Sequence, residues 1–216
     1  MEKQKSTLMK IVDNRYFCMA WLIAAVVFIT WFGALKVTYL GVEYPRFVKT
    51  ASVIAMVHPY LYYFWVLFTI VSLWLNISYM YRHYGYDSKA GKVSMYLGFL
   101  CIITTKIIPH EDDFNWRMVV HWTAALAFGV FCAASIILFL FNKSKTNKRF
   151  LITLLLFIAV LATMIILLVL FRENGAIETL PIWCAYLILY LVNYTHIYAE
   201  KSVEEITVSK EYSGRV

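Results

Sequence analysis

One short segment of the sequence, residues 106–121, holds most of the side chains that could do chemistry. It contains two imidazoles, three carboxylates and two cations. Asp113, Arg117 and His121 follow one another at steps of four residues, which would place them on one face of a helix. His58 stands at the start of another apolar run. These side chains could therefore meet if both segments lie on the same side of the molecule.

A metal site is one interpretation of this set. Three imidazoles and a carboxylate can bind zinc and leave one coordination position open for water. A zinc-bound water could attack an ester or an amide of a lipid. The sequence requires no cofactor, and it has neither an HExxH nor a GxSxG motif that would assign catalytic residues, so enzymatic activity stays open. The metal-ligand candidates are His58, His110, His121 and Asp113.

The same polar segment has two further interpretations. It could be a structural cluster of hydrogen bonds in which Asp112 or Asp113 caps the helix that follows. It could also bind a polar ligand or a lipid headgroup, because an ionisable side chain such as His121 is costly inside a bilayer unless it has a partner. The ligand-binding candidates are His58, Lys106, His110, Asp112, Asp113, Arg117 and His121.

Long apolar runs on both sides of this segment indicate the fold class. Apolar residues make up 62% of the chain and charged residues only 15%, whereas a soluble domain carries about a quarter charged residues. The runs are continuous rather than alternating, which favours helices over a β-barrel. The sequence therefore predicts an all-α, polytopic integral membrane bundle in a single domain, 1–216. The six predicted transmembrane helices span about 16–36, 58–80, 92–109, 117–141, 150–171 and 180–199, before a charged tail at 200–216.

The distribution of basic residues predicts the orientation of these spans. The segments on one side of the predicted membrane carry 14 of the 20 lysines and arginines. Positively charged loops stay in the cytoplasm, so the prediction is a cell-membrane protein with both termini cytoplasmic. The net charge of +7 follows this pattern and does not indicate a nucleic-acid partner. In this orientation His58, His110 and His121 lie together on the extracytoplasmic side.

Side-chain patterns predict which helix faces point inward. Spans two, three, four and six carry polar and small residues, whereas 150–171 is almost wholly aliphatic and should lie at the periphery. Ala125, Gly129 and Ala133 predict a small-residue packing surface in span four. The connection 37–57 could be an interfacial or re-entrant segment. One helical stripe in span two consists of His58, Tyr62, Trp65, Thr69, Ser72 and Asn76.

The segment from Ile108 to Asp113, followed by the Ala- and Gly-rich stretch from Val120 to Gly129, resembles the bacterial domain-of-unknown-function 998 family. It is also similar to the eukaryotic six-span group that contains the damage-regulated autophagy modulators, the Sfk proteins and the FGF-receptor-activating protein. The resemblance implies a six-span fold and a role in lipid handling or membrane signalling. His121 is the residue that corresponds by position to the family's pattern.

Three functions follow as hypotheses. The first is a multi-pass, non-enzymatic membrane protein whose outward-facing histidine and acidic pocket binds a lipid or a small polar ligand. The alternative is a metal-dependent membrane lipid hydrolase built on His58, His110 and His121. The further alternative is a small transporter, which would need an ionisable residue deep in the bilayer, and the middle of each predicted span has none. Membrane lipids are the expected partners, and the oligomeric state stays open.

Overall fold

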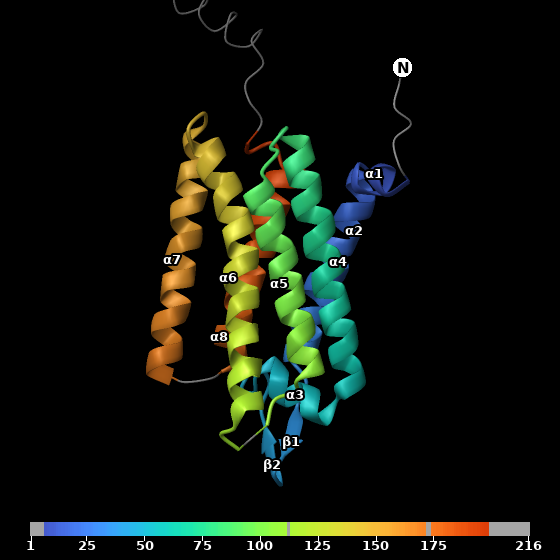
Figure 1. The fold of residues 1–216 in the computed structure, drawn as a ribbon, viewed down its shortest axis with the longest axis vertical. Coiled ribbons are helices and arrows are strands. Elements are labelled where there is room, and N and C mark those ends of the chain that lie inside the picture. The colour runs from blue at the N-terminus through green and yellow to red at the C-terminus, as the bar shows by residue number, and fades with distance from the viewer. Residues whose placement is uncertain (1–6, 112, 172–173, 199–216) are drawn as a thin grey trace, which may run out of the picture.

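The computed structural model describes residues 7–111, 113–171 and 174–198, with the side chains of Thr7 and Leu8 excepted. Over these residues the chain forms helices and one small sheet (Figure 1). In chain order the elements are α1 (Thr7–Val12), α2 (Arg15–Gly33), β1 (Val37–Tyr39), β2 (Val42–Tyr44), α3 (Ala51–Val57), α4 (Pro59–His83), α5 (Lys89–Ile107), α6 (Trp116–Ser144), α7 (Lys148–Phe171) and α8 (Gly175–Tyr194).

Within the described residues, six helices are long and apolar enough to cross a membrane, namely α2 and α4 to α8. They run side by side along the long axis of the molecule (Figure 1). The predicted all-α bundle of six apolar spans is confirmed at this level, and it fits a multi-pass membrane protein. The two strands and α3 lie at one end, called the hairpin end below. The opposite end, which carries α1, is called the α1 end.

The pairing of helices explains which of them are buried. α5 lies along α6, α2 lies along α4, and α8 contacts both α2 and α4. α7 contacts α6 and α8, and it is the least buried of the six. Its peripheral position is therefore confirmed. The sequence did not predict that α2 also packs in the interior, because α2 has no polar stripe that would indicate a buried face.

The polar stripe of α4 is confirmed, since Tyr62, Trp65, Thr69, Ser72 and Asn76 are all buried and His58 is half-buried. Asn76 lies at the centre of a cluster of hydrogen bonds. Its side-chain amide donates to the carbonyls of Cys18, at 3.1 Å, and Ser72, at 2.9 Å. Its Oδ1 accepts from the Tyr194 hydroxyl at 2.6 Å. This cluster joins α2, α4 and α8.

The predicted packing surface of α6 is wrong at two of its three positions. Ala125 and Gly129 are exposed, and a Cβ added at Gly129 would meet no atom within 4 Å. The close approach between helices comes instead from Gly98 on α5. A Cβ built there would lie 2.6 Å from Cys132 Sγ and 3.3 Å from the Cys132 backbone nitrogen, so only glycine lets α5 and α6 approach this closely.

The connection 37–57 forms the hairpin end. β1 and β2 pair antiparallel around Leu40 and Gly41, whose φ values of 51° and 77° suit a tight two-residue hairpin turn. The chain then returns to α8, where the amide of Ala176 donates to the Phe47 carbonyl at 3.0 Å. Thr50 caps α3 through its side chain. This connection therefore holds α3 across the end of the bundle.

Candidate functional site

His121 is the most buried of the predicted site residues. It lies in the second turn of α6 and is only 2% exposed. Its Nδ1 is 2.7 Å from the Ile108 carbonyl oxygen, and its Nε2 is 2.8 Å from Ser52 Oγ. A carbonyl oxygen only accepts, so Nδ1 carries the proton of the neutral imidazole. Nε2 is then the acceptor, and the Ser52 hydroxyl donates to it.

Three helix ends position this arrangement. Ile108 is the residue that closes α5, and its carbonyl belongs to the last turn, where helix geometry provides no partner. Ser52 lies in the first turn of α3, two residues after the capping Thr50. α6 begins after Asn115, whose side chain accepts from the Met118 amide at 3.0 Å. His121 thus joins α3, α5 and α6.

The predicted cap of this helix was wrong. Asp113 is exposed and stands before the first residue of α6, and Asp112 lies outside the described residues. Asn115 caps instead, and its amide nitrogen donates to Glu111 Oε2 at 2.5 Å. An asparagine side chain can satisfy the helix and the carboxylate at once, which an aspartate cannot, since a carboxylate has no donor.

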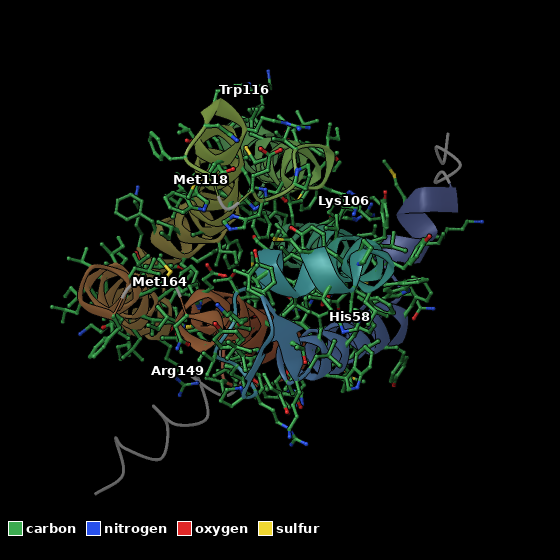
Figure 2. All side chains as sticks on the ribbon, turned by 90° about the horizontal axis from the view of Figure 1, so that it is seen from below. His58, Lys106, Trp116, Met118, Arg149 and Met164 are labelled. Carbon is green, nitrogen blue, oxygen red and sulfur yellow. The ribbon has the colours of Figure 1, made fainter. Side chains whose placement is uncertain are left out.

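A cavity of about 410 Å³ opens beside the Ser52–His121 pair. It lies between α3, the start of α4, the end of α5 and the start of α6. Its volume is within the range of small-molecule pockets. Figure 2 looks onto this end of the bundle, with Lys106 and His58 labelled there and Trp116 at the outer edge. The cavity is lined by Ser52, Ala55, Met56, Pro59, Tyr62, Thr105, Lys106, Ile107, Pro109, His110 and His121.

Lys106 gives this cavity a positive charge. Its ammonium lies 3.8 Å from the centre of the Tyr63 ring and 5.6 Å from that of Tyr62, so both rings hold it as cation–π partners. The Thr105 hydroxyl donates its one hydrogen to the Ile102 carbonyl at 2.7 Å. In its 2.9 Å bond with Tyr62 it is therefore the acceptor, and the Tyr62 hydroxyl donates. No carboxylate is found among the described lining residues. The wall therefore favours a neutral polar or an anionic group.

His110 adds a second imidazole to the wall. Its ring centre is 5.7 Å from that of His121, in an edge-on arrangement, and it stacks on Trp122. The Nδ1 atom of His110 is buried and has no hydrogen-bond partner in the part of the chain that the structure describes. Buried polar atoms are rarely left in this state, so a ligand atom or a water would gain a bond there.

Three further candidates that the structure describes do not line the cavity, namely His58, Asp113 and Arg117. Arg117 pairs with Glu111 at 2.8 Å on the surface and does not follow Asp113 along a helix face. His58 stands at the start of α4, half-buried, and is not part of the cavity lining. The structure thus brings together Lys106, His110 and His121 from the predicted set.

The predicted zinc ligands do not form a metal-binding group in the described residues. No three histidine, cysteine, aspartate or glutamate side chains lie close enough there to hold an ion. His110 and His121 are neighbours, but both ring nitrogens of His121 already face protein partners, Ile108 and Ser52. A zinc site stays a prediction from the sequence.

Ser52 is the residue that the sequence reasoning missed. It lies 69 residues from His121 in the chain, and no motif connects the two positions. The available signal was local and indirect. Thr50 followed by an apolar run indicates the start of a short helix, and this places Ser52 in its first turn. Only the folded connection 37–57 then shows that this turn faces α6.

Comparison with known proteins finds no matching family model, no matching curated protein and no matching solved structure. The family resemblance of the segment around His121 therefore stays a prediction, and the geometry of the cavity carries the functional argument.

Proposed function

We propose that this chain is a multi-pass membrane protein that binds the polar group of a lipid, or of a similar amphiphile, in the cavity at the hairpin end. The observation that carries the proposal is the composition of the cavity wall. One part is polar and positively charged, with Lys106 and two imidazoles, and the other part is apolar, with Ala55 and Met56 among its residues. A molecule with a charged head and a hydrocarbon part matches both.

The surface beside the cavity also suits an amphiphile. Ile107 lines the cavity and is 71% exposed, so the apolar part of the wall continues onto the outer surface of the bundle. Tyr60, Tyr63 and Trp116 are exposed near this end, and aromatic side chains concentrate at the boundary between lipid and water. We infer that the hairpin end lies at this boundary, on the side away from the cytoplasm, since the basic loops lie at the α1 end.

Lys106 provides the direct test. The full-length protein in lipid nanodiscs is irradiated with a photoreactive phosphatidylglycerol, and the cross-linked peptides are mapped. Cross-links are expected in 52–62 and 105–110. Lys106→Gln should lower their yield about tenfold at limiting lipid, because one charge-assisted contact contributes about 1.4 kcal/mol.

Lys143 is the matched control, because its ammonium also faces an aromatic ring, that of Tyr84, at the other end of the bundle. Lys143→Gln should leave the cross-linking of 52–62 and 105–110 unchanged. An equal yield for the wild type and Lys106→Gln would show that the cavity does not bind the anionic headgroup. A zwitterionic photoreactive phosphatidylcholine tests the charge preference, and it should give the lower yield in the wild type.

A further inference from the structure

We propose that Ser52 and His121 are a nucleophile and its general base, and that the cavity cleaves a carboxylic ester of an amphiphile. The inference rests on the proposed binding function, and it adds a reaction to it. The reaction requires no metal, and it involves a serine that no sequence motif indicates.

The geometry matches that of an activated serine. A nucleophile and its base lie within about 2.6–3.2 Å, and a third group orients the base. Here Ser52 Oγ is 2.8 Å from His121 Nε2, and the Ile108 carbonyl is 2.7 Å from Nδ1. The carbonyl fixes the tautomer in which Nε2 accepts the hydrogen bond of the serine hydroxyl and can take its proton. A backbone carbonyl takes the place that a carboxylate has in the familiar triad.

The surroundings distinguish this pair from an ordinary hydrogen bond between helices. His121 is held rigid by burial, whereas Ser52 is half-buried and lines the cavity together with it. A substrate carbonyl placed in the cavity would meet the serine hydroxyl and the base from the same side. Lys106 lines the same space and gives it a positive charge, which favours an anionic substrate beside the pair.

The reaction has two stages. Ser52 Oγ attacks the ester carbonyl carbon as its proton passes to His121 Nε2, and the new C–O bond gives a tetrahedral intermediate. The intermediate collapses, the ester C–O bond breaks, and the alcohol leaves with the proton from Nε2. Water then attacks the acyl-serine, gives a proton to Nε2, and releases the carboxylic acid as Ser52 Oγ takes that proton back.

The cavity wall indicates the substrate class. Met56, Pro59 and Ile107 provide an apolar side for a hydrocarbon chain, and Lys106 provides a charge for an anionic head. Esters of medium or long acyl chains should therefore react faster than acetate esters. The carboxylic acid product is itself an anion, so Lys106 would also favour its binding.

The test uses the purified full-length protein and a fluorophosphonate probe, which loses fluoride when an activated serine attacks its phosphorus. The expected result is one covalent adduct, located on Ser52 by peptide mass spectrometry. Ser52→Ala should form none, and His121→Asn should label at least about 100-fold more slowly, the lower limit for loss of a general base. Wild-type labelling should quicken as the imidazole loses its proton, which a purely structural histidine would not produce.

Ser78, a half-buried serine on α4, provides the matched control, because Ser78→Ala should label at the wild-type rate. Release of nitrophenol from octanoate and acetate esters gives the second measurement, with octanoate faster and Ser52→Ala inactive. A wild type that forms no Ser52 adduct and cleaves neither ester overturns the reaction. If the photoreactive lipid still cross-links to the cavity in that case, the binding function stands without it, and if it does not, both fail.

Discussion

Two buried polar clusters in the same bundle have different surroundings. Asn76 is fully buried, and both of its donor hydrogens and its Oδ1 are used by protein groups. His121 is buried almost as deeply and also contacts a backbone carbonyl, but it borders a cavity of about 410 Å³. A polar group closed in on all sides joins helices, whereas one beside open space can also contact a ligand. Burial alone does not distinguish the two.

The largest effect on stability is expected at Asn76. Asn76→Leu leaves the Tyr194 hydroxyl without its acceptor and removes two bonds to backbone carbonyls, so it should lower the free energy of unfolding by about 3 kcal/mol. His121→Leu removes the bonds to Ser52 and Ile108 but should cost less, about 2 kcal/mol, since water in the cavity can bond the freed Ser52 hydroxyl. Equilibrium unfolding in mixed detergent micelles measures both.

Thr163→Ala on the exposed face of α7 is the control for these two variants and should change the unfolding free energy by less than about 0.5 kcal/mol. Equal losses for Asn76→Leu and His121→Leu would remove the distinction, because both clusters would then be structural.

The second effect concerns the close contact of α5 with α6. This contact positions the residues around His121 and does not involve the cluster around Asn76. Gly98→Ala brings a methyl group to within 2.6 Å of Cys132 Sγ, and overpacking of this kind should cost about 2 kcal/mol. It should also move Ile108 away from His121 and slow labelling of Ser52. Gly129→Ala, one helix away, meets no neighbouring atom and should be neutral or slightly stabilising.

The double variant Gly98→Ala/Cys132→Ala separates the contact from the helix propensity of alanine. Removal of the sulfur should restore part of the lost stability. A Gly98→Ala protein that is as stable and as rapidly labelled as the wild type would show that the separation of α5 and α6 does not position the pair.

The smallest effect is expected at an exposed ion pair that belongs to neither cluster. Lys92, in the first turn of α5, donates at 2.5 Å to Asp87, which precedes the helix, and this bond and the lysine charge lower the pKa of Asp87 below 3.8. The contribution of this ion pair to stability is present above pH 3.8 and is lost as the pH falls through the lowered pKa of Asp87. The unfolding midpoints of the wild type and Asp87→Asn should therefore differ slightly at pH 6 and converge in stronger acid; a gap that widens there would contradict this.

The parts of the fold that the sequence predicts are those with a local, repeated signal. The stripe from Tyr62 to Asn76 is visible because each step of three or four residues returns to the same helix face. α7 is visible as peripheral because its sequence contains almost no polar residue. His121 stands out because an imidazole inside an apolar run needs a partner.

The rest depends on how distant segments meet, which periodicity does not encode. Ser52 becomes a partner of His121 only because the connection 37–57 crosses the end of the bundle. Three acids before α6 suggested a carboxylate cap, yet Asn115 can accept from the helix and donate to Glu111 at the same time. Gly129 has the spacing of a packing residue, but it lies on a face that no other part of the described chain covers.

The contact at Gly98 has a consequence for biogenesis. α5 is the least apolar of the six candidate spans, and α7 is the most apolar. A weakly apolar segment partitions poorly from the translocon into lipid by itself. α6 follows α5 after a short connection and covers the face that carries Gly98. We expect the two to leave the translocon as a pair, so that the part of the cavity wall that α5 and α6 provide forms during insertion, before α7 and α8 are synthesised.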